Sequence, residues 1–399
     1  MKRTSEAPPE LRVVLFETGA GQLTITAVAP DAPAPETWWH QAPLEVSKEG
    51  LLRQAGRLRT KWRDLVVRHQ STTAEYGRKV GGYPLADAAD LSELASLTET
   101  LTRELAEEGF DLLEVMLDGN GYDLGRFREF FLDTLADKES LRISFDSCLY
   151  LPWPMLAVDP SRCDSPWEAF LGHRHQVEQT NSSYPWEQRP IGHREQAATS
   201  LNTDTTLDRV GRAHEVRKLL DQRSRLTVRT HAHDLWAALS SPVLNEDLMY
   251  FWCHGHFVDN GTPYPHLAIK LSDGEHIDGT AVSRRRRRMT RTRQARFKPF
   301  VLLNACHAGQ AATTSQLEHL GKALIDLGAD GVLAPQIEIP QIFATEYAYA
   351  FLDLYLTGRH SAGEISQLLV QRFASEFHNP LALTYSLYCG INSRLNLAS

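Results

Sequence analysis

His254 and Cys306 are the two residues whose types and positions best suit nucleophilic chemistry. A cysteine nucleophile needs a base that takes its proton and N–H donors that stabilise a tetrahedral oxyanion. His254 follows the apolar run LMYFWC, and Cys306 follows the apolar run PFVLLNA 52 residues later. Because functional groups of parallel sheets gather at the carboxyl ends of the strands, we expect both side chains in loops just beyond two adjacent strands, over one crevice. The sequence therefore predicts acyl transfer with Cys306 as nucleophile and His254 as base.

Gly255 directly follows the predicted base and suggests where the oxyanion is held. A glycine lets the backbone turn sharply and come close to a substrate carbonyl. We therefore expect the backbone N–H groups of Gly255 and Cys306 to form the oxyanion hole.

The cysteines and histidines next to this pair leave alternatives open. His256 is a rival base, because alternation along an extended segment points it to the same side as His254. Cys253 is expected to face away from His254, into the core, as a structural residue. Cys306 could itself be an ordinary buried cysteine. These residues and His307 could also bind zinc, but adjacent residues of a strand point to opposite faces and converge poorly on one ion.

The segment 284–298 concentrates positive charge. It has eight arginines, one lysine and no acidic residue, whereas the rest of the chain has a formal charge of −17. We interpret it as a loop between the two catalytic strands. Three roles stay open: a solvated loop, a docking site for nucleic acid or an acidic partner, or a self-cleavage site of an arginine-preferring enzyme. Few aromatic residues interleave the run, which weakens a base-stacking role. The arginines are Arg284, Arg285, Arg286, Arg287, Arg288, Arg291, Arg293 and Arg296.

Composition indicates a globular protein rather than a disulfide-rich or membrane-spanning one. Of the 399 residues, 42% are hydrophobic and 23% are charged, as is usual for globular chains. The five cysteines lack paired spacing, so we expect them to be reduced. The N-terminus carries two positive charges without an apolar signal-peptide core, and no run of about 18 apolar residues occurs. We therefore expect a cytoplasmic protein with no membrane span.

Two regions are expected before the catalytic segment. Residues 1–45 read as a small β appendage, with a hairpin around GAG in LRVVLFETGAGQLTITAV and a Pro-rich linker, PDAPAPETWWHQAP. Residues 46–137 read as an N-terminal helical region, because apolar residues recur every three or four positions. The helical stretches are 51–67, 91–109 and 125–137.

Residues 138–399 are expected to form one α/β domain. Strands are predicted at 141–151, 225–230, 248–253, 299–305, 331–335 and 383–389. Helices are predicted at 207–223, 233–239, 315–328, 342–356 and 362–377. Continuous apolar strands separated by amphipathic helices predict a mainly parallel sheet with helices on both faces. The polar segment 172–205 is expected to hold a further strand and a surface loop.

Four motifs, taken in order, resemble the CHAT-domain proteins, a branch of the caspase–separase group of cysteine peptidases. LPWPML (151–156) is similar to the family's LPWE-type element, and FWCHGH (251–256) carries its His-Gly pair. VLLNACHAG (301–309) carries its cysteine after an apolar strand, and GADGVLAP, two helices and HNPLALTY follow as in the family's C-terminal part. The resemblance covers roughly residues 90–399. It implies a caspase-like α/β fold, preceded here by the N-terminal helical region and the short β appendage.

This resemblance also implies an activity. It implies a cysteine endopeptidase with His254 as base and Cys306 as nucleophile, which needs no metal or cofactor, although some relatives use calcium for activation. It implies a regulated bacterial protease in antiviral defence or programmed cell death, whose substrate is a protein such as a gasdermin-like or toxin-type effector. The N-terminal region would then bind an activating or inhibitory partner.

Three positions depart from the family pattern. Pro154 stands where the family often has Glu, and QIEIPQ (336–341) stands where it often has Trp and Asp. Gly309 lies three residues after the cysteine, whereas in caspases the glycine lies two residues after it. The substrate pocket is therefore not defined by the sequence. The acids that could select an arginine substrate are Asp259, Asp273, Asp330 and Glu338.

Two other classes of function stay open. A catalytically silent caspase-like scaffold would keep the fold without the chemistry, but the presence of both His254 and Cys306 argues against it. A protein that binds nucleic acid or an acidic partner through 284–298 would depend on charge rather than on the cysteine. Labelling by a cysteine-directed probe and salt-dependent binding would separate these classes.

Overall fold

One sheet runs through the part of the chain that this computed structural model describes, residues 8–19, 21–29, 39–70, 82–136, 140–147, 149–181, 195–241, 244–258, 266–290, 298–306 and 317–397. Its thirteen strands follow the order β10-β9-β8-β11-β12-β13-β5-β4-β1-β2-β3, and β6 pairs with both β7 and β8. The strands are β1 (Leu11–Glu17), β2 (Leu23–Val28), β3 (Trp39–Pro43), β4 (Arg142–Ser147), β5 (Gln176–Thr180), β6 (Ala197–Thr203), β7 (Ser224–Arg229), β8 (Leu248–Val258), β9 (His266–Lys270), β10 (His276–Asp278), β11 (Phe300–Cys306), β12 (Gly331–Pro335) and β13 (Tyr385–Tyr388).

Most strand pairs are parallel, as the sequence predicted. Parallel pairing joins β7, β6, β8, β11 and β12 in one part of the sheet, and β13, β5, β4 and β1 in the other. Antiparallel pairs join β1 to β2, β2 to β3, β8 to β9, β9 to β10, and β12 to β13. The predicted N-terminal hairpin is confirmed as β1 and β2. The sheet is therefore mixed, and β8, which carries His254, is parallel to β11 on one side and antiparallel to β9 on the other.

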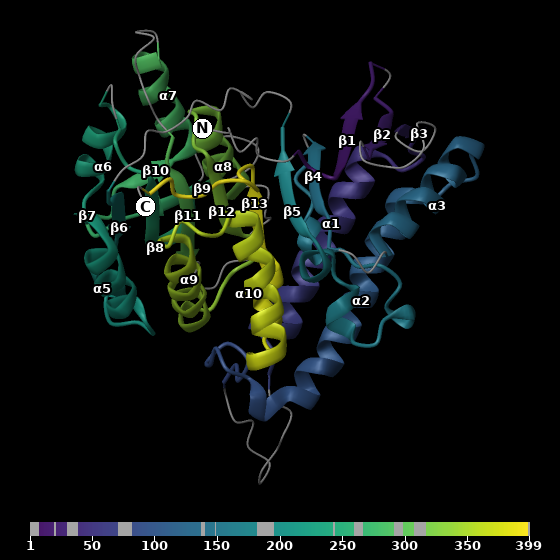
Figure 1. Cartoon of the computed structure of the whole chain (residues 1–399), viewed down its shortest axis with the longest axis horizontal. Helices are drawn as coiled ribbons and strands as arrows, with labels where there is room; N and C mark the ends of the chain where they lie inside the picture. The colour runs from purple at the N-terminus through teal and green to yellow at the C-terminus, as the bar shows by residue number, and fades with distance from the viewer. Residues whose placement is uncertain are drawn as a thin grey trace.

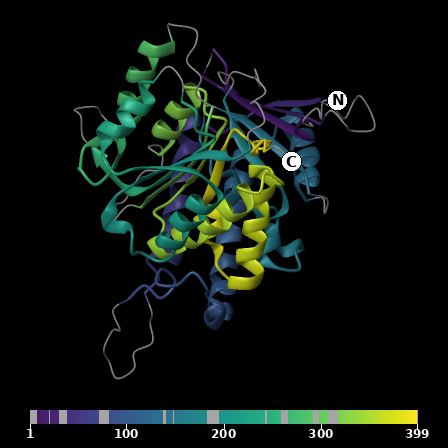
Figure 2. The same ribbon diagram turned by 60° about the vertical axis from the view of Figure 1, so that its left-hand side comes forward.

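Helices cover both faces of the sheet. On one face lie α6 (Ala232–Leu239), α7 (Gly279–Thr290) and α8 (Leu317–Asp326), which contribute to one buried apolar cluster. On the other face lie α5 (Ala213–Arg223), α9 (Gln341–Tyr355) and α10 (Ala362–Phe377), which belong to a second, larger cluster. In Figure 1 the first group lies above the strands and the second below, and Figure 2 keeps the same separation. The sheet is thus the middle of three layers, as in other α/β folds.

The N-terminal helices are α1 (Lys48–Trp62), α2 (Ala95–Leu117) and α3 (Tyr122–Ala136). All three were predicted, but α2 continues past its predicted end at 109 to Leu117. Arg59 of α1 is buried and donates to Gln336 Oε1 at 3.0 and 2.8 Å, and to the Tyr150 carbonyl at 2.6 Å. β1 pairs with β4, so the N-terminal strands extend the same sheet as the C-terminal strands. The domain boundaries at 45 and 137 stay predictions.

Several elements differ from the predicted ranges. β3 lies inside the stretch predicted as a linker. β4 ends at Ser147, before the prolines of LPWPML, which lack the N–H that a strand ladder needs. That motif instead forms the 3-10 turn Trp153–Met155, where Trp153 stacks on Phe145 with 3.8 Å between ring centroids. None of the helices within the described ranges is long and apolar enough to cross a membrane.

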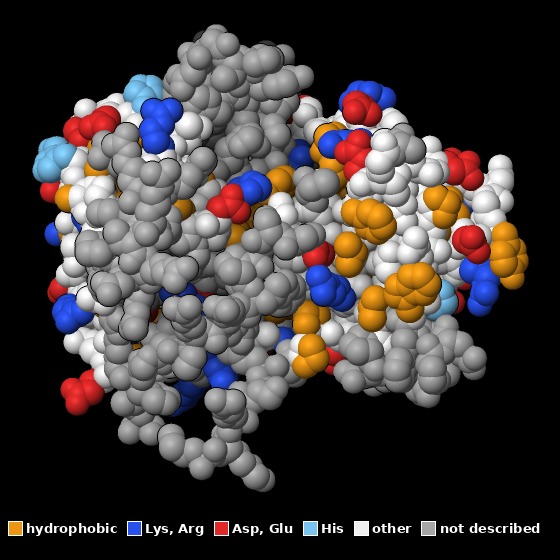
Figure 3. All heavy atoms as spheres, turned by 90° about the horizontal axis from the view of Figure 1, so that it is seen from above, with side chains coloured by type: hydrophobic (Ala, Val, Ile, Leu, Met, Phe, Trp, Pro, Cys, Tyr) orange, Lys and Arg blue, Asp and Glu red, His pale blue; other side chains and the backbone are white. Residues whose placement is uncertain are grey.

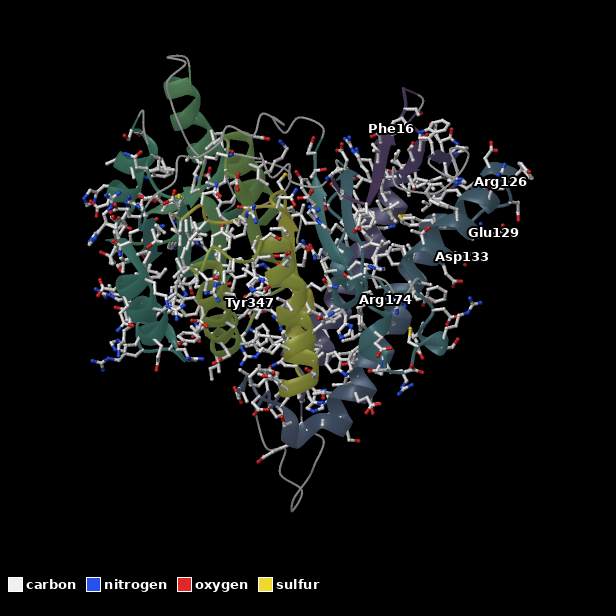
Figure 4. All side chains as sticks on the ribbon, viewed as in Figure 1. Phe16, Arg126, Glu129, Asp133, Arg174 and Tyr347 are labelled. Atoms are coloured by element: carbon white, nitrogen blue, oxygen red, sulfur yellow. The ribbon has the colours of Figure 1, made fainter. Side chains whose placement is uncertain are left out.

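The sheet end formed by β1, β2 and β3 carries exposed apolar side chains. Phe16 is 40% exposed and Trp39 is 59% exposed. Figure 3 shows hydrophobic side chains gathered on this half of the molecule, and Figure 4 labels Phe16 on β1. This end of the sheet therefore keeps apolar surface in contact with solvent, unlike the doubly covered strands around β11.

Candidate active site

β8 and β11 are adjacent parallel strands, as the sequence predicted, and they bring positions 254 and 306 to the same level. The two strands pair over seven consecutive positions, from Leu248 opposite Phe300 to His254 opposite Cys306. Paired residues of neighbouring strands share a face of the sheet. Positions 254 and 306 therefore lie side by side at the carboxyl edge. The structure describes the backbone of Cys306 but not its side chain, so the catalytic role of Cys306 stays a prediction.

The strand that ends at Cys306 is apolar because both of its faces are covered. Val301 and Leu303 belong to the cluster under α8, and Phe300 and Leu302 belong to the cluster under α9. All four side chains are fully buried. A strand packed on both faces gives position 306 a rigid support.

Asn304 anchors the end of β11 to α9 and β13. Its Nδ2 donates to the Ala344 carbonyl at 2.9 Å, and its Oδ1 accepts from the Tyr385 hydroxyl at 2.8 Å. Tyr385 stacks on Tyr347 with 3.9 Å between ring centroids, and Figure 4 labels Tyr347 on α9 beside α10. Burial raises the pKa of Tyr347, as expected for a hydroxyl in a dry core. The buried amide two residues before Cys306 is thus hydrogen-bonded on both sides.

His254 and Gly255 both lie inside β8, so the loop expected at His254 and the sharp turn expected at Gly255 are wrong. β8 continues to Val258 because β9 pairs with it antiparallel from His254 onward. Gly255 is opposite Ile269 in this pairing and is buried. The backbone stays extended here, and the proposed role of the Gly255 N–H as an oxyanion donor no longer rests on a turn.

His254 contacts two residues that follow the neighbouring strand β6. Its Nε2 lies 3.8 Å from Asp204 Oδ2 and 3.5 Å from Thr206 Oγ1. Asp204 is the first residue after β6, and Thr206 lies in the 3-10 turn Thr205–Leu207 that follows. A histidine that meets a carboxylate and a hydroxyl on one nitrogen has the surroundings of an oriented general base.

The turn that carries Asp204 and Thr206 is fixed from several sides. Asp204 caps it, because its Oδ1 accepts from the Thr206 N–H and from the Thr206 hydroxyl, each at 2.9 Å. The indole N–H of Trp252 donates to the Leu207 carbonyl at 3.2 Å. The Thr205 N–H donates to Ser272 Oγ at 2.9 Å. The contacts to His254 therefore come from a preorganised segment.

His256 and Cys253 occupy different surroundings from His254. His256 Nε2 contacts His276 Nδ1 on β10, with 4.3 Å between the ring centroids. Cys253 is fully buried in the cluster on the α6–α8 face, which confirms the predicted structural position. Of the two histidines in CHGH, His254 is the one beside position 306 in the register.

Three of the four candidate specificity acids are described, and each has a partner. Asp273 accepts from the Ala232 N–H at 2.7 Å and so caps α6. Asp330 pairs with Lys298 at 3.4 Å before β12 begins, at the sheet edge opposite to His254. Glu338 follows β12 at the same edge as His254 and pairs with Arg68 at 3.0 Å. Asp259 lies outside the described residues. Each of these three acids is thus already bonded to a group of this chain, and none is singled out as a specificity residue.

The arginine run begins in a helix, and the predicted loop is wrong for residues 284–290. α7 extends through Thr290 and includes Arg284 to Arg288. Asp278 caps this helix, because its Oδ1 accepts from the Ala281 N–H at 2.7 Å. Arginine has a high helix propensity and the segment lacks proline, which explains why the helix continues through the charges. Arg291, Arg293 and Arg296 lie outside the described residues.

Sequence reasoning missed Asp204 and Thr206. The strand before them, β6, reads AATSLNT and is fully buried although most of its residues are not strongly apolar. The signal that could have found them is Asp204-Thr-Thr206 after a short strand, since Asp is a preferred cap for a following turn.

Comparisons with known proteins match the chain to a domain family and to a curated relative. The profile of the CHAT domain family matches residues 125–371, a range that includes both 254 and 306. A curated protein from Vitiosangium sp. (strain GDMCC 1.1324), named a probable protease, is 28% identical over 138 residues. That match covers 35% of this chain and 17% of the relative, so this chain spans only a small part of its length.

Solved structures of low sequence identity also match. Two crystal structures of the Saccharomyces cerevisiae separase–securin complex align with 95% of this chain and 30% of the matched chain. Their TM-scores are 0.48 and 0.47, each at 10% identity.

Proposed function

We propose that this chain, which belongs to the CHAT domain family, is a cysteine endopeptidase in which His254 and Cys306 form the catalytic dyad. The observation that carries the proposal is the register of β8 and β11, which sets His254 directly opposite Cys306 at the carboxyl edge of the sheet. The family match and the relative named a probable protease support the same reaction class.

The proposed reaction uses residues of this chain only. His254 takes the proton of the Cys306 thiol, and the thiolate attacks the carbonyl carbon of the scissile peptide. Backbone N–H groups of Cys306 and Gly255 are the proposed donors to the oxyanion. Expulsion of the amine, with a proton returned from His254, leaves a thioester that water hydrolyses. The support for Gly255 is its position next to His254 on β8.

The proposed substrate is a protein, and the proposed setting is regulated proteolysis. The family resemblance supports a cytoplasmic defence or cell-death protease acting on a gasdermin-like or toxin-type effector. An activating or inhibitory partner at the N-terminal region is supported by the contact of α1 with the segment after β12, through Arg59 and Gln336. A partner that moved α1 would act on the same sheet edge that carries His254.

A peptide-cleavage assay tests this function. Wild type, Cys306→Ala and His254→Gln are incubated with peptides ending in Arg, Lys, Asp or Leu, and products are identified by mass. Cys163→Ala is the matched control, because Cys163 is a partly exposed cysteine remote in sequence from both strands. We expect cleavage by the wild type and by Cys163→Ala only. Cleavage that persists in Cys306→Ala would contradict the dyad.

Anion binding by α7 is a second candidate function. The observation that favours it is a helix that carries five consecutive arginines, Arg284 to Arg288, in an otherwise acidic chain. A concentration of positive charge of this kind attracts polyanions such as nucleic acids. The test is binding of DNA and RNA oligonucleotides at several salt concentrations. Steep salt dependence that disappears when 284–288 are replaced by Gln would support it.

A further inference from the structure

We propose that Asp204 and Thr206 are positioning residues that fix which nitrogen of His254 carries the proton, a role that rests on the proposed dyad. They make Nε2 the protonated nitrogen and leave Nδ1 as the base. The inference starts from the three atoms at the His254 end of the site: Asp204 Oδ1, Thr206 Oγ1 and His254 Nε2.

The direction of the hydrogen bonds follows from counting protons. A threonine hydroxyl has one proton to donate and lone pairs with which to accept. The Thr206 hydroxyl donates its proton to Asp204 Oδ1 at 2.9 Å. Its contact with His254 Nε2 at 3.5 Å can therefore be a hydrogen bond only if Nε2–H is the donor. The neutral imidazole then has its lone pair on Nδ1.

Asp204 adds a charge effect to this choice of tautomer. When the S–H bond of Cys306 breaks and an N–H bond forms at Nδ1, the imidazole becomes an imidazolium and the thiol a thiolate. Asp204 Oδ2, 3.8 Å from Nε2, is then the nearest described carboxylate oxygen. The Asp204 side chain is only 12% exposed and that of His254 is 36% exposed, so water screens this attraction incompletely.

The hydrogen bonds that hold Asp204 and Thr206 in place indicate a positioning role rather than a chance contact with His254. Asp204 is held by its own bonds to the Thr206 N–H and hydroxyl, and its backbone N–H donates to the Trp252 carbonyl at 3.1 Å. Trp252 lies two residues before His254 on β8. Asp204 and Thr206 directly follow β6, and β6 is paired with β8, which carries His254. This pairing fixes the distance between the positioning residues and the histidine.

A nuclear magnetic resonance measurement tests the tautomer without any need for activity. In protein labelled with ¹⁵N-histidine, two-bond ¹H–¹⁵N correlations distinguish the Nε2–H from the Nδ1–H form. The signals that vanish in His254→Gln identify His254. We expect the Nε2–H form in the wild type and a mixture of tautomers in Thr206→Val. A His254 ring that is mainly Nδ1–H in the wild type would overturn the proposal.

Kinetics test what the pair does for the reaction. We expect Thr206→Val to lower kcat by about 10- to 100-fold with KM little changed, because it removes part of what general acid–base catalysis contributes. Thr206→Ser, which keeps the hydroxyl, should restore most of the loss. Asp204→Asn keeps a good cap for the turn and removes only the charge, so it should lower kcat while thermal stability stays close to the wild type.

Matched controls separate a local role from a general loss of folding. Thr227 of β7 and Asp221 of α5 are exposed, so Thr227→Val and Asp221→Asn make the same chemical changes away from His254. Equal kcat losses in these controls, or no kcat loss in Thr206→Val and Asp204→Asn, would contradict a positioning role. If the wild type cleaves no peptide and Cys306 resists labelling, the proposed function fails, while the tautomer measurement still decides the role of Thr206.

Discussion

Replacing Gly109 by alanine should destabilise the protein, although alanine usually stabilises a helix interior. Gly109 lies in the middle of α2, where Ala is favoured over Gly by about 1 kcal/mol. A Cβ atom at this position would lie 2.5 Å from the Met155 carbonyl oxygen and 3.2 Å from the Ala157 backbone N. Both obstacles are backbone atoms, so the helix itself must move. Overpacking of this kind costs about 1–3 kcal/mol, which offsets the propensity gain and leaves a net loss of about 0–2 kcal/mol.

Gly56 provides the matched control for this prediction. It lies in the middle of α1, and an added Cβ would meet no atom within 4 Å. Gly56→Ala should therefore stabilise the protein by about 1 kcal/mol. The free energy of unfolding of both variants is measured by urea denaturation. We expect the two variants to differ by about 1–3 kcal/mol, with Gly56→Ala the more stable. Equal stabilisation by both would refute the close packing of α2 against the LPWPML segment.

Two further predictions concern the support of the site and the dependence of stability on pH. Asn304→Leu removes the hydrogen bonds to Ala344 and Tyr385 and should lower the free energy of unfolding by about 1–3 kcal/mol. A double-mutant cycle with Tyr385→Phe should give a coupling energy of about 0.5–1.5 kcal/mol between the two side chains. A coupling of zero, from denaturation curves, would show that the two side chains do not interact. Burial, with a smaller contribution from Arg174, lowers the pKa of His173 from 6.5 to about 4. Between these values the unfolded chain binds a proton that the folded chain does not, so stability falls as pH falls from 6.5 to about 4. In His173→Gln the melting temperature should therefore fall less between pH 6.5 and about 4 than in the wild type. The same dependence of melting temperature on pH in both proteins would contradict this prediction.

The parallel core was predictable because its strands are buried on both faces. LMYFWC and PFVLLNA read as continuous apolar runs, which predicts two buried strands of one sheet. The register that sets His254 opposite Cys306 is seen only in the structure. The extent of β8 was not predictable in the same way. It depends on pairing with β9, an element further along the chain, and local sequence around Gly255 does not reveal that partner.

The sequence did not give the bounds of β6, and it predicted a loop where α7 forms, for opposite physical reasons. β6 buries polar side chains that are hydrogen-bonded, such as Asn202 Nδ2 to the Tyr250 carbonyl at 3.3 Å, so it lacks the apolar pattern of a core strand. Asp204 and Thr206 were missed because the sequence did not show where β6 ends. In α7 the block of charge suggested a loop, but the Asp278 cap and the high helix propensity of arginine extend the helix through Arg288.

The most direct test of the account is whether Cys306 reacts as an activated nucleophile only when His254 is present. The protein is treated with peptidyl acyloxymethyl ketones bearing Arg, Lys, Asp or Leu, and the modified residue is located by peptide mass mapping. Labelling with iodoacetamide under denaturing conditions verifies that each thiol is intact. We predict that one probe modifies Cys306 in the wild type far faster than Cys163, and that His254→Gln abolishes this preference without changing the fold. Equal slow labelling of Cys306 and Cys163 in the wild type, or unchanged labelling of Cys306 in His254→Gln, would contradict the proposed dyad.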